Sequence, residues 1–216
     1  MSDRQKKIKI NSNWLVIAAA AFALAVIACI AGISAGTLAG RAAEAPSDAV
    51  EGFFEALVDG DYDKLNESIT GVSEFNFDCN SEDANAVLAY NALKASYEFE
   101  LEGESSISGL DAVQNVRFRY LDLNAIKKDL NAEAKKILTA KEAGEKNRRN
   151  LYDEDNELID SVAEEIFNEA FGRLLENAES YYKEEILSVK ARNVRGHWLT
   201  VPDSTLIKAI SGGTAQ

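Results

Sequence analysis

Cysteine and histidine are scarce in this chain of 216 residues, which has two cysteines, Cys29 and Cys79, and one histidine, His197. Two cysteines are too few for a disulfide framework. A single histidine with no Cys-x-x-Cys pair excludes the common structural zinc sites. A glycine-rich phosphate-binding loop is also missing. We therefore expect neither a metal nor a cofactor.

Charge is missing from residues 10–40, which hold no Asp, Glu, Lys or Arg. Within this stretch, residues 14–30 are apolar on every helical face and the apolar run continues to Leu38, and about 20 such residues cross a bilayer core. The basic residues lie mainly before the run, and only Arg41 follows it closely. Because basic flanks stay in the cytoplasm, the sequence predicts a cytoplasmic stub at 1–13, a transmembrane helix at 14–38 and a tether at 39–46. The domain at 47–213 then lies outside the cell membrane, with the lipid bilayer as its first partner.

Two other interpretations of the apolar run stay open. Residues 43–45 resemble the small-x-small site of a cleaved secretory signal, although the apolar part of such signals is only about 7 to 15 residues long. Residues 26–29 resemble the lipidation motif of a bacterial lipoprotein, with Cys29 as the lipidated residue. The apolar run nevertheless continues past Cys29 to Leu38, where a lipoprotein normally has a polar tether. We therefore favour an uncleaved anchor.

Small residues in the second half of the run recur at four-residue spacing, at Gly32, Gly36 and Gly40. Residues at this spacing share one helix face and allow two backbones to approach closely. Small residues are also common in ordinary membrane spans. A generic anchor is the favoured interpretation, and pairing of two copies into a homodimer stays open.

The charge of the chain is divided by the apolar run. Residues 1–13 carry +3, and the total is −13, so the remainder carries −16. An acidic external domain repels nucleic acid, which excludes a nucleic-acid partner. The expected partner is instead an unknown protein or small molecule. Cys79 lies on the outer side and is expected to be an unpaired thiol or a bridge between two chains.

Three helices are predicted at the start of the external domain. Residues 47–59 have apolar side chains at helical spacing, with Ser47 as the expected N-cap and Gly60 at the end. A second short helix starts at Asp61. A third starts at Ser81. The side chains expected to face the core are Tyr62, Leu65 and Ile69 in the second helix and Val87, Leu88 and Leu93 in the third.

The pattern then changes to the alternation of a half-buried strand. Tyr97, Phe99 and Leu101 alternate with glutamates. A turn is predicted at 103–106, followed by a strand at 107–120 with a bulge at Gly109. Arg117 and Arg119 are expected to face the glutamates at 98–102 across the hairpin.

The second half of the domain is predicted to be helical and then to return to strands. Helices are expected at 124–143 and 158–175, joined by a polar connection at 144–150. The later helix has a broad apolar stripe that needs a cover. The remaining expectations are a strand with Leu187, Val189 and Ala191 on one face, a turn near 193–196, a strand at 197–201 and a short terminal helix capped by Asp203.

Two segments resemble a known family. Residues 46–65 (PSDAVEGFFEALVDGDYDKL) resemble the opening helix of NTF2-like domains, and residues 196–213 (GHWLTV and LIKAISGG) are similar to the end of DUF4878-like and DUF5105-like proteins. The resemblance implies an α+β cystatin-like, NTF2-like fold, with helices packed on a curved antiparallel sheet. It implies a bacterial protein with an N-terminal signal or anchor. The helical stretch 124–182 is then an insertion between strands of the sheet.

The chemistry-bearing residues do not form an obvious catalytic set. His197 is the one candidate general base, and it needs a pocket and a carboxylate partner. Asp59, Asp61 and Asp63 alternate as in a calcium loop, but the glycine and the closing glutamate of that loop are absent. These aspartates are expected to serve as caps. Tyr181 and Tyr182 are expected to continue the core stripe, with a binding surface as the alternative.

Three hypotheses about function follow. The favoured one is a non-catalytic binding or interaction module anchored in a bacterial cell envelope. The second is an NTF2-like isomerase or dehydratase that uses His197 with a nearby carboxylate. The third is a helical scaffold that docks a partner through 124–182, which requires an exposed apolar stripe on 158–175.

Overall fold

The structure is a computed structural model that describes residues 45–71, 84–145 and 150–214. No helix within those ranges is long and apolar enough to cross a membrane. The predicted span at 14–38, with Gly32, Gly36 and Gly40, lies outside the described residues, as do Cys29 and Cys79.

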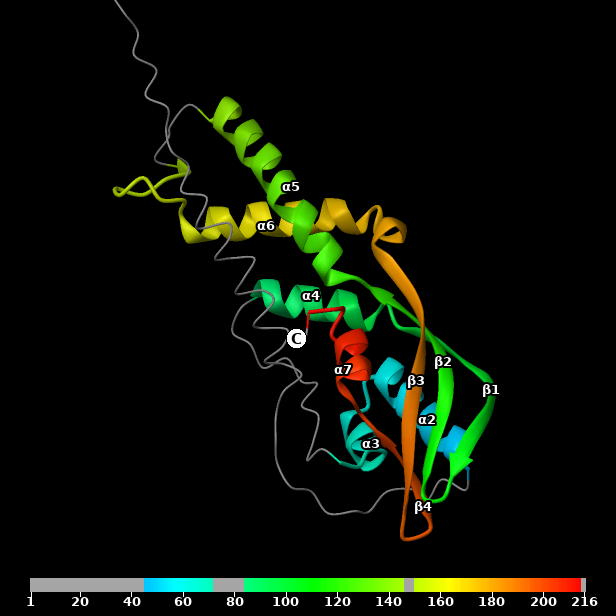
Figure 1. Cartoon of the computed structure of the whole chain (residues 1–216). Coiled ribbons are helices and arrows are strands. Elements are labelled where there is room, and N and C mark those ends of the chain that lie inside the picture. Colours follow the sequence, from blue (N-terminus) through cyan, green and yellow to red (C-terminus); the bar gives the residue numbers. More distant parts are fainter. Residues whose placement is uncertain (1–44, 72–83, 146–149, 215–216) are drawn as a thin grey trace, which may run out of the picture.

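The domain is α+β, as predicted, and is built on one antiparallel sheet of four strands in the order β1-β2-β3-β4 (Figure 1). The strands are β1 (Glu98–Ser108), β2 (Asp111–Leu121), β3 (Tyr182–Val194) and β4 (His197–Val201). The helices α2 (Pro46–Asp59), α3 (Tyr62–Glu67) and α4 (Ala84–Lys94) precede the sheet. The helices α5 (Leu123–Gly144) and α6 (Asp160–Leu175) and the short 3-10 helix η2 (Ala178–Tyr181) lie between β2 and β3, and α7 (Ser204–Ile210) ends the order.

The helix boundaries follow from local capping. Gly60 ends α2 with a φ of 70°, and the side chain of Asp61 caps α3 by accepting the Lys64 N–H at 3.0 Å. Asp203 caps α7 in the same way, as predicted. The prediction that Ser47 is the N-cap of α2 is wrong. Ala45 occupies that position, and its N–H donates to the Asp48 carboxylate. The short helix α3 stops at Glu67, so the prediction that Ile69 belongs to it is wrong, and Ile69 is buried beside Thr200 of β4 instead.

The inner face of the sheet carries the core. Val116 and Phe118 of β2 and Leu187 and Val189 of β3 are buried, as the alternation predicts. The ring of Phe54 on α2 lies 5.2 Å from that of Phe118. The outer face is polar and exposed, and there Arg119 pairs with Glu98 at 2.9 Å. Arg117 pairs with Glu102, so the predicted row of cross-strand ion pairs is confirmed.

The β1–β2 hairpin corrects two predictions. The turn lies at Gly109–Leu110, between the paired residues Ser108 and Asp111. The bulge lies between Glu102 and Ser106, where a turn was predicted, and Gly103 has a φ of 67°. Gly103 and Gly109 both have a positive φ, so either one suits a turn or a bulge. The side chain of Gln114 decides between them, because its amide donates to the carbonyls of Glu102 and Gly103 and fills the bulge.

The helix α4 turns a different face to the core than predicted. Its buried residues are Ala86, Ala89, Tyr90 and Leu93, whereas Leu88 is exposed. The buried set has the i, i+3, i+4, i+7 spacing of one helix face. Small alanines allow close packing there, and the prediction gave too much weight to the larger aliphatic side chains.

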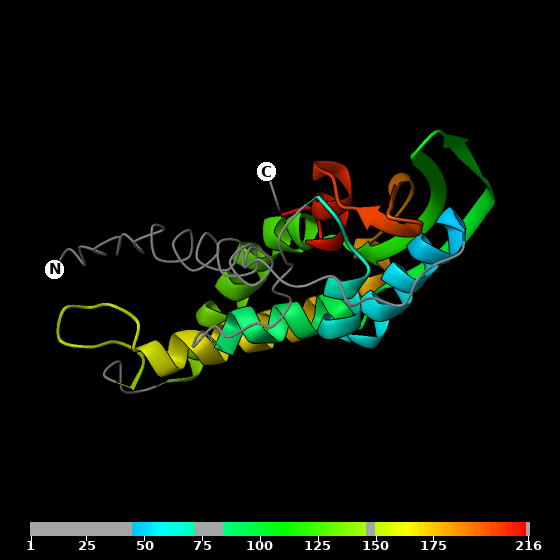
Figure 2. The ribbon, with the colours of Figure 1, turned by 90° about the horizontal axis from the view of Figure 1, so that it is seen from below.

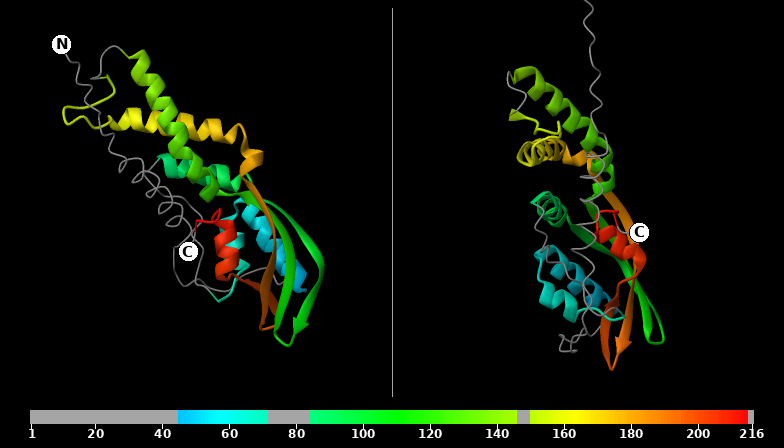
Figure 3. Two further views of the ribbon diagram at one scale, coloured as in Figure 1. Left: turned by 45° about the horizontal axis from the view of Figure 1, so that its top comes forward. Right: turned by 90° about the vertical axis from the view of Figure 1, so that its left-hand side faces the viewer.

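A helical arm, formed by α5 and α6, lies between β2 and β3 in the chain and stands at one end of the sheet (Figure 3). The stripe on 158–175 is covered, as its breadth predicts, so the exposed stripe that the scaffold hypothesis requires is not found. The two helices pack against each other, and the buried side chains of α6 are Ala163, Ile166, Phe167, Ala170 and Phe171.

Candidate functional site

His197 lies at the start of β4, opposite Val194, and its side chain is exposed. The turn before it is formed by Arg195 and Gly196, both with positive φ, as in a tight hairpin turn. Trp198, the next residue, points to the inner face and is buried. The histidine is therefore on the rim of the sheet and not in a pocket, so the geometry that the enzyme hypothesis requires is not found at this residue.

Polar side chains do meet on the inner face of the sheet, at the end where the helical arm leaves it. We call Tyr120, Lys183 and Glu185 the inner-face cluster. The Tyr120 hydroxyl donates to Glu185 Oε1 at 2.8 Å, and Lys183 Nζ lies 2.7 Å from Glu185 Oε2. The pairing register puts Tyr120 opposite Lys183 and Phe118 opposite Glu185, so the cluster continues directly from the apolar core.

The protonation states of the inner-face cluster follow from its surroundings. Burial, and then the bond to Glu185, raises the pKa of Tyr120 to about 12. Burial acts to raise the pKa of Glu185, but hydrogen bonds from Lys183 and Tyr120 outweigh it and leave that pKa below its usual range. The pKa of Lys183 is raised, mainly by its hydrogen bond to Glu185. At neutral pH the cluster is thus a neutral phenol, a carboxylate and an ammonium group.

This arrangement suits binding better than proton transfer. A general base works best when its pKa lies near the operating pH, and the pKa of Glu185 has moved away from it. The side chains of Lys183 and Glu185 are 46% and 31% exposed, so both charges remain open to a polar ligand. The alternation of Leu187, Val189 and Ala191 extends backwards to Glu185 and Lys183. This alternation in the sequence was sufficient to place Lys183 and Glu185 on the core side of β3.

A second polar cluster joins α3 to α4. The Tyr62 and Tyr90 hydroxyls lie 2.9 Å apart, and Lys94 Nζ donates to the Tyr62 hydroxyl at 2.6 Å. The same ammonium group lies 4.9 Å from the centre of the Tyr62 ring. It sits beside Gly60, where a Cβ atom is placed 2.6 Å from it. A cation beside the last turn of α2 is stabilised by the helix dipole, which gives this cluster a structural role.

The remaining residues that the sequence offered as candidates make contacts that stabilise the fold or belong to no site. Tyr181 donates to Asp129 on α5 at 2.9 Å, and Arg119 stacks over the Tyr182 ring at 3.8 Å from its centre. Asp61 is a helix cap. Asp59 and Asp63 belong to no group of three or more metal-ligating side chains within residues 45–71, 84–145 and 150–214, where no such group is found.

The β1–β2 hairpin carries three exposed aliphatic side chains, a feature that the sequence interpretation missed. We call Ile107, Leu110 and Val113 the hairpin tip. Leu110 is 66% exposed, the highest value among the large hydrophobic residues described. Ile107 is 58% exposed and shares second place with Ile186. Turns are usually polar, so a leucine in this turn was the available signal.

Comparison of the chain with family models, with curated proteins and with solved structures gave no match. The function must therefore be argued from the residues themselves.

Proposed function

We propose that this chain is a single-pass membrane protein of a bacterial envelope whose external α+β domain is a non-catalytic binding or interaction module. One observation carries the proposal. The uncharged stretch 10–40 separates a stub of charge +3 from a remainder of charge −16. Such a stretch is long enough to cross a bilayer, and the basic flank fixes its direction.

The geometry of the polar groups supports binding over catalysis. His197 lies exposed at a hairpin and not beside a carboxylate in a pocket. The inner-face cluster holds an ion pair beside a neutral phenol whose O–H already donates to Glu185, and it offers two opposite charges to a ligand. A small molecule with both an acidic and a basic group, or a polar loop of a partner protein, has the chemistry to bind there.

We further propose that the fold is of the NTF2-like, cystatin-like kind. Its support is the order of elements, three helices followed by an antiparallel sheet that bends toward them, with α2 packed on the inner face (Figure 1). The helical arm is an addition between β2 and β3. Proteins of this shape use the inner face of the sheet for ligands, which agrees with the place of the inner-face cluster.

The membrane topology is tested with reporters fused to the C-terminus of the full chain in a bacterium. An alkaline phosphatase fusion is expected to be active and a green fluorescent protein fusion dark, because the first reporter works only outside the cytoplasm and the second only inside. Both fusions are expected to stay in the membrane after a carbonate wash. A bright fluorescent fusion with an inactive phosphatase contradicts the proposal.

A matched control inverts the basic flank. Replacing Arg4, Lys6, Lys7 and Lys9 by glutamate leaves the apolar run unchanged and removes the charge bias that orients it. Phosphatase activity is expected to fall while membrane attachment remains. Mass measurement of the intact protein then separates an uncleaved anchor from a signal cut after residue 45.

A further inference from the structure

The described chain enters the domain at the end of the sheet where the hairpin tip lies. The Thr200 hydroxyl donates to the Ala49 carbonyl at 3.2 Å, which fixes the first turns of α2 beside β4. Thr200 pairs with Ala191, and Ala191 pairs with Ala112, only two residues after Leu110. The later part of α2 lies elsewhere, since Phe54 stacks on Phe99 near the start of β1.

The helix α2 therefore starts at the end of the sheet with the hairpin tip and runs toward the end with the helical arm (Figure 2). Ala45, which precedes α2, lies at the same end as Leu110. This location matters because the chain arrives there from the proposed membrane span.

The tether is short compared with the sheet. Ala45 is the seventh residue after Leu38, and seven extended residues reach at most about 25 Å. A strand as long as β3, with 13 residues, extends over roughly 43 Å. If the span ends at Leu38, the start of α2 is held near the bilayer surface. The helical arm is then the part farthest from it.

The side chains at this end suit the surface of a bilayer. Ile107, Leu110 and Val113 are three of the six exposed large hydrophobic residues among those described, and they occupy one hairpin. Scattered apolar residues need no explanation, but half of the exposed large hydrophobic residues described lie at this one hairpin, with Ile107 on its inner face and Val113 on its outer face. Arg192 and Arg195 belong to the neighbouring β3–β4 hairpin, and the charge of Arg192 is balanced by Asp111 at 2.7 Å.

We propose that the hairpin tip is a membrane-docking surface that inserts Ile107 and Leu110 into the lipid headgroup region beside the domain's own transmembrane helix. This inference rests on the proposed function, because it requires the span at 14–38. Arginine beside exposed aliphatic side chains is the composition expected at a membrane interface. Docking holds the domain upright and turns the helical arm toward the outside, where a partner meets it first.

The test is lipid quenching of the full chain in phosphatidylcholine vesicles, with Cys29 and Cys79 replaced by serine. A single cysteine at residue 107 or 110 carries an environment-sensitive fluorophore. The matched control is Ile186→Cys, because Ile186 is 58% exposed, as Ile107 is, but lies opposite Arg117 in the middle of the outer face. Lipids with a nitroxide on the headgroup are expected to lower the emission at residues 107 and 110 at least twofold and to leave residue 186 nearly unchanged.

Equal quenching at residues 107, 110 and 186 overturns the proposal. So does a blue-shifted but unquenched signal at residue 110 together with 110–110 disulfide cross-linking, because a second copy of the chain then covers the tip. A further variant carries the fluorophore at residue 108 with Ile107→Asp and Leu110→Asp. It is expected to keep the melting temperature of the parent and to lose the quenching.

Flotation of the vesicles in a density gradient separates the two proposals. Protein that fails to float contradicts the membrane span and hence the proposed function. Protein that floats without quenching at the tip contradicts the docking surface alone.

Discussion

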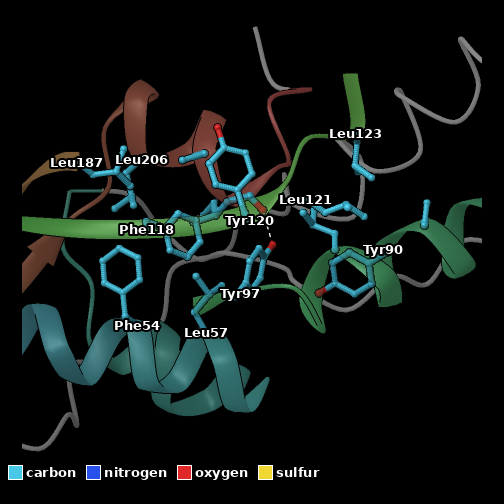
Figure 4. Packing of buried hydrophobic residues seen from close by; sticks show 14 of the residues in the cluster. Phe54, Leu57, Tyr90, Tyr97, Phe118, Tyr120, Leu121, Leu123, Leu187 and Leu206 are labelled. Atoms are coloured by element: carbon cyan, nitrogen blue, oxygen red, sulfur yellow. Dashed lines mark hydrogen bonds between the residues drawn. The ribbon is translucent and has the colours of Figure 1, made fainter. Parts of the chain in front are cut away.

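The two ends of strand β2 differ in what their apolar side chains contact. At the end near the helical arm, Phe118, Tyr120 and Leu121 are fully buried, among side chains of α2, α4, α5, β3 and α7 (Figure 4). At the hairpin end of the same strand, Val113 is 37% exposed. The strand thus stabilises the fold at the end near the helical arm and exposes apolar surface at the hairpin end.

The buried end is also where the C-terminus is fixed. The Tyr97 hydroxyl donates to the Ile210 carbonyl, and the Leu123 N–H donates to the Gly212 carbonyl at 3.0 Å. Residues at the end of the chain therefore connect the start of β1 to the start of α5. At the hairpin end the described contacts join neighbouring strands, α2 and the short segment after α3 that pairs with Thr200. This contrast predicts large effects of substitution at one end and small effects at the other.

The largest effect is expected for Phe118→Ala. Phe118 is 0% exposed and its ring contacts those of Phe54, Tyr97 and Tyr120, so its removal leaves a cavity and should cost about 3–5 kcal/mol of unfolding free energy. Leu110→Ala, at the hairpin tip, should change it by about 0.5 kcal/mol or less. Denaturant unfolding of the full chain in mild detergent, followed by circular dichroism, measures both. Similar losses for the two variants contradict the contrast between the two ends.

The next largest loss of stability is expected for Gly212→Ala, with Gly109→Ala as its matched control. Gly212 has a φ of 61°, and a Cβ there is 2.8 Å from a Leu123 side-chain carbon and 2.9 Å from the Leu121 carbonyl oxygen. Gly212→Ala combines backbone strain with overpacking and should cost roughly 2–4 kcal/mol. Gly109 has a φ of 65° but no atom within 4 Å of an added Cβ. Gly109→Ala should therefore cost only about 1–2 kcal/mol, and equal melting temperatures of the two variants speak against tight packing at the C-terminus.

A smaller effect is expected for Tyr97→Phe. The side chain is buried, and burial raises the pKa of its hydroxyl. Loss of the hydroxyl leaves the Ile210 carbonyl without that donor, which should cost about 1–3 kcal/mol. The control is Tyr181→Phe, whose exposed hydroxyl bonds Asp129 and whose loss should cost about 0.5 kcal/mol. If the control proves the more damaging of the two, the C-terminal contact does not stabilise the fold.

The smallest effect concerns pH. The pKa of Glu185 is lower in the folded domain than its ordinary value, so its contribution to stability is present above the unfolded pKa, about 4.3, and is lost as the pH falls through the folded pKa. Glu185→Gln is expected to make stability less dependent on pH below about pH 5. Lys183→Gln should act in the same direction, because it removes the cation that lowers the pKa of Glu185. If the pH dependence of stability is unchanged in both variants, the ion pair between Lys183 and Glu185 does not stabilise the folded domain.

Most of the secondary structure could be predicted from local patterns. Strand alternation placed Val116, Phe118, Leu187 and Val189 on the core face, and capping residues such as Asp61 marked helix starts. These features depend on neighbours in the sequence. The assignment of Gly103 to the bulge depends instead on Gln114, eleven residues away, which no local pattern indicates.

The candidate sites depended on tertiary structure still more strongly. The inner-face cluster needs the register between β2 and β3, and 60 residues lie between the end of one strand and the start of the other. The stripe on α6 was predicted correctly, but its cover, α5, could not be. Exposure or burial of an apolar stripe depends on what packs against it, and that information is absent from the stripe itself.

We expect the domain to stand by its hairpin end on the external surface of the membrane that its span crosses, with the helical arm pointing away. The most direct measurement compares headgroup-nitroxide quenching of fluorophores at residue 110 and at residue 140, an exposed position near the far end of α5. Strong quenching is expected at residue 110 and none above background at residue 140. Quenching at residue 140 that equals or exceeds that at residue 110 contradicts this orientation of the domain.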